Sequence, residues 1–346
     1  MIAIMLALCT GLAFCACGAK EKEVVEKETA LTTVGFSQIG AESDWRLAST
    51  SSMQASFNAT MGYRLVYDDG QQKQENQLKA MREFIDSEVD YIVLDPITEL
   101  GWDATLMEAK EAGIPVILVD RQVSVEDDSV YTAWVGSDFL LEGQRACAWL
   151  EAYLSSISYE GEVNIAHIQG TTGSSAQIGR SDALEEAAEQ MGWNIVAQED
   201  ADFVQAKGRE VMESMLEECG DLINVVYCEN DSEALGAIEA IENYGKTPGS
   251  NIAEGEIMVI SFDATEDGLR QTLAGKIALD TECNPNYGTV AEKLISSLKK
   301  GEIVPHEYYM EESQFSGLSE VNTITVDGKT YDVTMVTDAI IAGRNY

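Results

Sequence analysis

The stretch LTTVGFSQIGAESDWR, residues 31–46, decides the fold. An apolar run from Leu31 to Phe36 is typical of a β-strand, and a polar loop with Gly40 follows it. Ser43 or Asp44 can then cap a helix. A strand that leads through a polar loop into a helix is where open α/β sheets bind ligands, at the carboxyl ends of their strands. The stretch therefore predicts both a sheet and a candidate binding site.

The loop carries side chains that suit a small polyhydroxylated molecule. Trp45 offers an aromatic face to C–H groups, while Arg46 and Glu42 can each hydrogen bond a pair of hydroxyls. Ser37 adds a neutral polar group at the end of the strand. The alternative is that Trp45 and Arg46 are ordinary residues of a first helical turn, one packed and the other solvated.

The order of strand, loop and helix recurs along the chain. It predicts further strands at 63–67, 91–94, 115–119, 163–168, 193–197, 223–227, 257–262 and 276–281. It predicts helices at 44–61, 74–86, 100–112, 139–157, 175–191, 206–218, 232–244, 266–274 and 286–300. Wholly apolar strands joined to helices by short loops favour a parallel, doubly wound sheet.

The alternation of predicted helices and strands begins again with the helix at 139–157, so we expect two similar α/β lobes rather than one long sheet. The segments 276–281 and 286–300 are too few for a third lobe, and we expect both to return to the first. A length of 346 residues also exceeds one comfortable hydrophobic core.

Charge excludes one class of partner. The chain has 60 acidic and 22 basic side chains, which gives a formal charge of −38 at pH 7. A surface this negative repels nucleic acid and anionic membranes. We therefore expect no nucleic-acid partner.

The first 17 residues have a different character. The run from Ile2 to Ala16 is almost wholly apolar, too short to span a membrane but as long as the hydrophobic region of a signal peptide. Phe14-Cys15-Ala16-Cys17 looks like a bacterial lipobox, which would make Cys17 the lipidated first residue of the mature protein. A charged tether at 18–30 follows. The alternative is a plain cleaved signal, and either form predicts export.

Enzymatic motifs are absent from the sequence. There is no P-loop, no nucleophile elbow and no metal-ligand spacing, so we expect no catalytic residue, no cofactor and no metal. His167 lies at the end of a strand, where a packed residue is more common than a catalyst. Beyond the leader, Cys147, Cys219, Cys228 and Cys283 form no CxxC pair, and their three possible full disulfide pairings stay open.

Hydrogen-bonding residues follow nearly every predicted strand at its carboxyl end. They include Ser37, Asp95, Asp120, Arg121, Asn230, Asp231, Asp263 and Glu282, and Arg180 comes early in the helix that follows Gln169. In a two-lobed protein such ends face one cleft, where small molecules bind. Asp and Asn also end strands because they favour turns and caps. That alternative does not account for arginines and an indole at the same edge.

Several motifs together carry a resemblance to a known family. They are Val34-Gly35-Phe36-Ser37-Gln38, Glu42-Ser43 with Trp45-Arg46, the run from Asp69 to Gln77, Val119-Asp120-Arg121, Gln169-Gly170-Thr171 with Arg180, and Asn230-Asp231. Over residues 31–310 the chain resembles the periplasmic sugar-binding proteins of ABC importers, of the type I, ribose/galactose class. Within that class it looks most like the galactofuranose-binding proteins of enteric bacteria.

The resemblance implies two Rossmann-like lobes joined by three hinge crossovers, with a monosaccharide in the cleft between them. It implies a first lobe of residues 31–137 plus 283–311 and a second lobe of 138–282 plus 312–346. It implies ligand contacts from Trp45, Arg46, Asp120, Arg121, Arg180, Asn230, Asp231, Asp263 and Glu282, with Glu42 and Ser37 as further candidates. Hinge closure would trap the sugar.

The same resemblance implies a monomeric lipoprotein, anchored by Cys17 on the outer face of the cytoplasmic membrane or periplasmic in a Gram-negative cell, that delivers sugar to an ABC permease. The alternative is a sugar-sensing protein that feeds a chemoreceptor or histidine kinase. Glu229 departs from the family, which usually has His before Asn230-Asp231, and Phe262 and Ala264 replace the usual neighbours of Asp263. These departures leave the identity of the sugar open.

Overall fold

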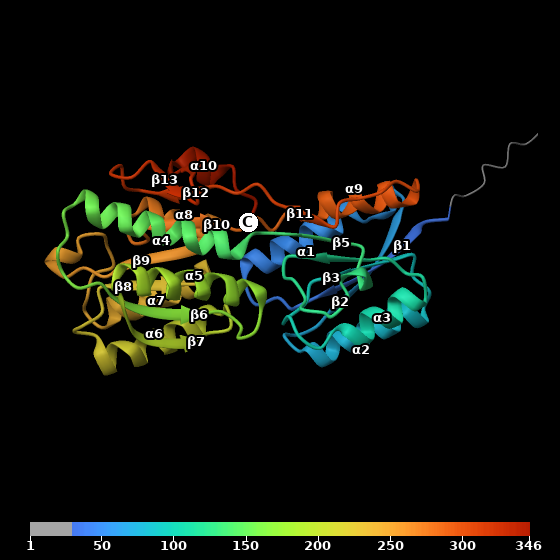
Figure 1. Ribbon diagram of the computed structural model, residues 1–346, viewed down its shortest axis with the longest axis horizontal. Helices are drawn as coiled ribbons and strands as arrows, with labels where there is room; N and C mark the ends of the chain where they lie inside the picture. The colour runs from blue at the N-terminus through green and yellow to red at the C-terminus, as the bar shows by residue number, and fades with distance from the viewer. Residues whose placement is uncertain (1–29) are drawn as a thin grey trace, which may run out of the picture. The chain divides into compact units, whose positions relative to one another are not determined.

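The computed structural model describes residues 30–346 (Figure 1). The predicted signal peptide, Cys17 and all but the last residue of the predicted tether lie outside the described residues. In the part of the chain that the structure describes, no helix combines the length and apolar character that a membrane span requires.

Two sheets organise the described chain. The first has the order β11–β5–β4–β3–β1–β2, formed by β1 (Thr32–Gln38), β2 (Tyr63–Asp69), β3 (Tyr91–Leu94), β4 (Val116–Val119), β5 (Ala133–Gly136) and β11 (Glu307–Tyr309). All of its strand pairs are parallel. Its helices are α1 (Asp44–Ser56), α2 (Gln74–Asp86), α3 (Asp103–Glu111) and α9 (Gly288–Lys299). Short 3-10 turns lie at Ala59–Met61 and Asp128–Val130.

The second sheet has the order β15–β12–β10–β9–β8–β6–β7. Its strands are β6 (Asn164–Gln169), β7 (Asn194–Asp200), β8 (Val225–Cys228), β9 (Met258–Asp263), β10 (Leu279–Glu282), β12 (Gln314–Ser316) and β15 (Thr334–Met335). Its helices are α4 (Phe139–Ser156), α5 (Ser175–Met191), α6 (Gln205–Cys219), α7 (Asp231–Asn243), α8 (Glu266–Leu273) and α10 (Asp338–Ala342). A hairpin of β13 (Thr323–Val326) and β14 (Lys329–Asp332), and a 3-10 turn at Ile252–Glu254, complete it.

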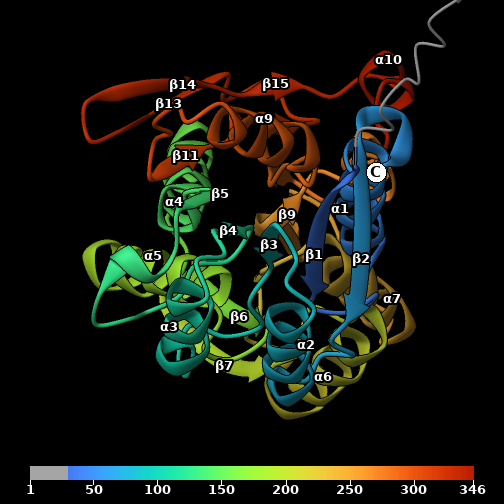
Figure 2. The ribbon, with the colours of Figure 1, turned by 90° about the vertical axis from the view of Figure 1, so that its right-hand side faces the viewer.

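The hydrophobic core of the first lobe has two layers, one on each face of the first sheet. Val93 on β3 packs with Met53 of α1 and Ile295 of α9, whereas its neighbour Ile92 packs with Met81 of α2. Figure 2 shows α2 and α3 on one side of the first sheet and α1 and α9 on the other. Because successive side chains of a strand point to opposite faces, a wholly apolar strand needs helices on both. The predicted α/β fold with two lobes is confirmed.

The chain passes between the two sheets three times. The crossovers run from β5 to α4 at 137–138, from β10 to α9 at 283–287, and from β11 to β12 at 310–313. Three crossovers agree with the prediction, and they bring three separate segments to the junction of the lobes.

One predicted segment lies in the other lobe. The strand expected at 276–281 forms β10, which pairs with β9 and β12 in the second sheet, so the prediction that it returns to the first lobe was wrong. Its register with β9, Leu279 opposite Ile260, extends the second sheet by one parallel strand. The helix after it, α9, does pack against α1, where the Gly288 N–H donates to Ser52 Oγ at 3.0 Å.

Two local predictions were also corrected, and one strand was missed. The helix expected at 44–61 ends at Ser56, because the Asn58 side chain accepts hydrogen bonds from the N–H groups of Thr60 and Met61 and starts a separate 3-10 turn. The helix expected at 100–112 begins only at Asp103, after Gly101 at a left-handed φ of 91°. The sequence pattern did not predict β5.

Gly288 is required where the returning helix meets the first lobe. A Cβ atom there would overlap the carbonyl oxygen of Ser52. We expect Gly288→Ala to lower the free energy of unfolding by about 1–3 kcal/mol, as overpacking does. Urea unfolding followed by circular dichroism measures the change. Gly343→Ala is the matched control, because its Cβ would lie 3.4 Å from the nearest atom, and an equal loss in both variants would contradict the prediction.

Candidate functional site

A cavity with about 310 Å³ of empty space has walls from both lobes. The first lobe contributes Glu42, Ser43, Trp45, Arg46, Asp120 and Arg121; the second contributes Phe139, Ala176, Arg180, Phe203, Asn230 and Asp263; and Cys283 comes from the second crossover. Eight of the eleven residues predicted from the sequence as ligand contacts line it.

Arg46 anchors the first wall. Its Nε donates to Glu42 at 2.8 Å, and its Nη1 donates to Asp95 at 2.5 Å and to Asp120 at 2.9 Å. Burial acts to lower the pKa of Arg46, but the three carboxylates, Asp95 foremost, outweigh it and raise the pKa well above its ordinary value. The guanidinium thus stays charged, and it also lies 4.6 Å from the centre of the Trp45 ring.

Trp45 is held by the second crossover. Its indole N–H donates to the carbonyl oxygen of Cys283 at 2.6 Å, and its ring meets that of Tyr287 edge to face. The polar end of the indole is therefore satisfied within the protein. Because Trp45 still lines the cavity, what it offers a ligand is ring surface rather than a hydrogen bond.

Arg121 keeps a donor free. Its Nη1 donates to the carbonyl oxygen of Ile97 at 2.7 Å, and its guanidinium lies 5.1 Å from the centre of the Phe203 ring. Burial, and then the neighbouring Arg46, lower the pKa of Arg121 below its ordinary value. Its buried Nε has no hydrogen-bond partner among residues 30–346. An unpaired buried donor costs free energy, so a ligand oxygen here would be stabilising.

Arg180 is the counterpart on the second wall. Its Nε donates to Glu142 at 2.8 Å and its Nη1 to the carbonyl oxygen of Glu229 at 2.5 Å. Its Nη2 lies 4.0 Å from Asp263, whose pKa is raised well above its usual range by burial although Arg180 opposes the shift. Ligand hydroxyls that donate hydrogen bonds to Asp263 would stabilise its ionised form and so oppose the rise of its pKa.

Three residues that line the cavity have strained backbone conformations. Asp120, Phe203 and Asp263 all line the cavity and have φ values of 59°, 62° and 110°. Non-glycine residues avoid this region at a cost of about 1–3 kcal/mol each, and such residues cluster at ligand sites. The strained positions turn these side chains inward at the ends of β4, β7 and β9.

Three predicted contacts lie outside the cavity lining. The Asp231 carboxylate accepts hydrogen bonds from Ser261 and from both the N–H and the hydroxyl of Thr265. Glu282 accepts from the N–H of Ser313 and from Arg344 and Tyr346 at the end of the chain. Ser37 is fully buried at the end of β1. The structure does not bring these three to the ligand cavity, and their part in binding stays a prediction.

The sequence reasoning missed five lining residues: Ser43, Phe139, Ala176, Phe203 and Cys283. It searched strand ends for polar groups, so Phe203, just beyond the end of β7, gave no signal. Cys283 was considered only for a disulfide. In the range that the structure describes, Cys147, Cys219, Cys228 and Cys283 are all unpaired. The rule that strand ends face the cleft could have found Phe203 had it included apolar residues.

Glu229, the departure from the family pattern, supports the second wall from behind. Its carboxylate lies 2.9 Å from His167 Nε2 and accepts from Gly170 N–H at 2.8 Å and Ser181 Oγ at 2.6 Å. The interpretation of His167 as a packed strand residue is confirmed, because its side chain is fully buried in β6. This network fixes the backbone oxygen that Arg180 donates to.

The sequence of the chain is similar to those of known proteins. Residues 34–302 match the model of the periplasmic binding protein domain. The galactofuranose-binding protein YtfQ of Escherichia coli K12 is 37% identical over 284 residues, which cover 81% of this chain and 86% of that protein. The ribose import binding protein RbsB of Bacillus subtilis is 29% identical over 250 residues, 68% of this chain and 76% of that protein.

Three solved structures are similar to this chain in fold and sequence. A Mycobacterium smegmatis protein in complex with β-D-fucofuranose has a TM-score of 0.77 at 39% identity and covers 83% of this chain and 91% of its own. A galactofuranose-binding protein has a TM-score of 0.76 at 36% identity, with 82% and 93% covered. The binding component of the arabinose ABC transporter of Shewanella sp. ANA-3, bound to L-arabinofuranose, has 0.75 at 36%, with 82% and 91% covered.

These relatives are solute-binding proteins and not enzymes, in agreement with the absence of enzymatic motifs from the sequence. The family match spans more than half of the chain, and the cavity between the lobes has the charged and aromatic lining expected of a sugar site. The chain therefore belongs to the periplasmic binding protein family, among the sugar-binding proteins of the ribose/galactose class.

Proposed function

We propose that this protein is the substrate-binding lipoprotein of an ABC importer and that its cargo is a monosaccharide in the furanose form, with galactofuranose as the first candidate. The observation that carries the proposal is the cavity lined by arginines and carboxyls from both lobes and by the rings of Trp45, Phe139 and Phe203. Planar charged groups hydrogen bond pairs of hydroxyls, and aromatic rings cover C–H surface.

The furanose form is supported by the solved relatives. The three at 36–39% identity with TM-scores of 0.75–0.77 are a fucofuranose complex, a galactofuranose-binding protein and an arabinofuranose complex. Relatives named for import, such as those for ribose and fructose, support transport rather than sensing. Delivery would require an ABC permease that recognises the closed, loaded protein.

Capture would proceed by closure about the crossovers. We assign residues 31–137 and 283–311 to the first lobe and 138–282 and 312–346 to the second, because the chain changes sheet at these points. A sugar would bind first to the wall that holds Trp45 and Arg121. Rotation of the second lobe would then bring Arg180 and Asp263 onto the remaining hydroxyls, so that bound sugar stabilises the closed form.

A panel of sugars tests the cargo. Free D-galactose contains a furanose minority, so a furanose site should bind it with an affinity reduced by that fraction. Methyl galactopyranoside, locked in the six-membered form, should not bind. Calorimetry gives the affinities, and a melting-temperature shift serves as a screen because a ligand at 100 times its Kd stabilises the native state by about 2.7 kcal/mol. Equal affinity for the locked pyranoside would reject the furanose proposal.

Two substitutions test the wall of the first lobe. We expect Trp45→Ala and Arg121→Ala each to abolish measurable sugar binding. Trp45→Ala removes the ring surface that covers C–H groups of the sugar, and Arg121→Ala removes a buried hydrogen-bonding charge, at a cost of about 2–5 kcal/mol. Arg121→Lys should also bind weakly, because an ammonium cannot reproduce the planar fork. Arg82→Ala is the matched control, since Arg82 pairs with Glu108 at the exposed surface. Near-normal affinity in Arg121→Ala with intact melting would count against this site.

The lipid anchor is tested at Cys17, whose thiol would carry the lipid. Expressed with its leader in a bacterial host, the protein should sediment with membranes, and Cys17→Ser should release it to the soluble exported fraction. Cys219→Ser, at a partly exposed and unpaired cysteine, should remain with the membranes. Membrane association that survives Cys17→Ser would exclude lipidation at this residue.

A further inference from the structure

Glu312 joins the three crossovers. It lies on the third crossover, and its Oε1 accepts hydrogen bonds from Ser137 Oγ on the first crossover at 2.5 Å and from Asn284 N–H on the second at 2.9 Å. One carboxyl oxygen thereby holds together every segment that connects the lobes. The other carboxyl oxygen, Oε2, takes no part in these two hydrogen bonds.

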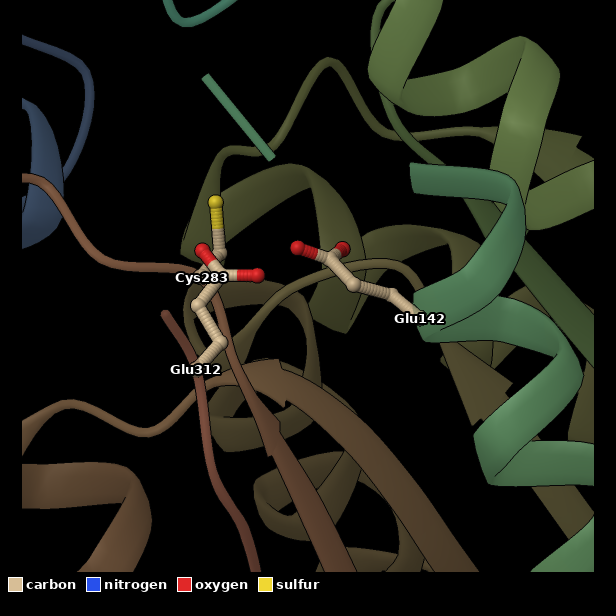
Figure 3. Close-up of side chains that lie close together, drawn as sticks. All are labelled: Glu142, Cys283 and Glu312. Carbon is tan, nitrogen blue, oxygen red and sulfur yellow. The ribbon is translucent and has the colours of Figure 1, made fainter. Parts of the chain in front are cut away.

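That second oxygen faces Glu142, in the first turn of α4. Figure 3 shows the two carboxyl groups pointing toward each other beside Cys283. One carboxyl oxygen of each glutamate and the Cys283 Sγ all lie within 4.8 Å of one another. Glu142 Oε2 is taken by Arg180, whereas Glu142 Oε1 is buried and has no donor among the residues that the structure describes.

We propose that Glu142 and Glu312 share a single proton, and that this proton couples the hinge of the protein to Arg180 in the sugar cavity. Each carboxyl has one oxygen already committed and one free, so one proton between the free oxygens satisfies both. Two ionised carboxylates at this separation and burial would instead repel each other. Glu142 and Glu312 are thus positioning residues for Arg180, which touches the cavity.

The surroundings decide which residue carries the proton. Burial raises the pKa of Glu312 well above its usual range, and the charge of Glu142 adds to the shift. Burial also raises the pKa of Glu142, but Arg180 opposes it. Glu312 therefore holds the proton and Glu142 stays paired with Arg180. Other ionisable groups that face the pair are Arg145 of α4, Tyr227 of β8, Asp263 of β9, Glu282 of β10, and Cys283 and Tyr287 of the second crossover.

Solvent can reach the pair from the side away from the sugar. A second cavity is lined by Glu142 and Glu312 and by Asp138, Leu141, Arg145, Tyr309, Met310, Glu311, Lys329 and Tyr331. Protons can thus exchange without opening of the sugar cavity. A divalent cation between the carboxyls and the Cys283 thiol is the competing occupant, but the adjacent Arg180 and Arg145 already supply positive charge.

The sign of the pH dependence follows from the raised pKa. If closure brings the two carboxyls together, the closed form binds one proton more tightly than the open form. Its advantage is complete at low pH and is lost as pH rises through the pKa of the closed form. Because one proton is involved, the Kd for sugar should rise by at most about tenfold per pH unit between the pKa of the open form and the pKa of the closed form, and level off above the latter.

The first experiment measures the Kd for the bound sugar in the wild-type protein and in Glu312→Gln between about pH 5 and pH 9. We expect the wild-type Kd to rise with pH and the Glu312→Gln Kd to be independent of pH, because an amide cannot lose the proton. Glu311→Gln, its exposed neighbour, is the matched control and should keep the wild-type profile. A flat wild-type profile, or an unchanged slope in Glu312→Gln, would overturn the proposal.

The second experiment does not depend on sugar binding, on which the first one rests. An infrared difference spectrum of wild-type protein minus Glu312→Gln at neutral pH should contain the carbonyl stretch of a protonated carboxyl. Its absence would overturn the shared proton even if every sugar failed to bind. Zn²⁺ bound by the wild-type protein at one equivalent, and lost in Cys283→Ser, would replace the proton with a metal and overturn the proposal as well.

Discussion

The structure depends on the neutralisation of arginine charges buried in its cavity. Arg46 and Arg180 are almost wholly removed from water, and each has carboxylate partners at hydrogen-bond distance, foremost Asp95 and Glu142. A buried ion without a partner would cost several kcal/mol, so these charges must be balanced before any ligand arrives. Each wall is thus charged, rigid and largely satisfied, and a few groups such as Arg121 Nε remain for the ligand.

The same pairing connects the cavity to the hinge. Trp45 donates to the backbone of the second crossover, and Glu142 stands between Arg180 and Glu312. In the proposed site, Trp45 is thus one hydrogen bond away from a crossover, and Arg180 is linked to another through the Glu142 carboxyl, which lies beside Glu312. In the proposed mechanism, a change at the crossovers would shift the donors of both walls together, so that a small ligand would bias the relative position of the two lobes.

Some of the site could be predicted because it follows from strand order. Asp120 and Arg121 end a wholly apolar parallel strand, and the carboxyl ends of such strands meet at one edge. Asp231 follows β8 at the start of α7 and Glu282 ends β10, yet their carboxylates accept hydrogen bonds from Thr265 and from Arg344 and Tyr346, respectively. Strand position alone does not tell which way a terminal side chain turns or what else competes for it.

The sequence by itself determined the two-lobed α/β fold, the family and the cleft side of the sheets, because periodicity, turn residues and motifs are local properties of the chain. Tertiary structure alone decided that β10 belongs to the second sheet and that Glu142 meets Glu312. Those outcomes depend on which distant segments come within hydrogen-bond range. Burial then sets the energy of each charge, and no local pattern encodes burial at a junction of three crossovers.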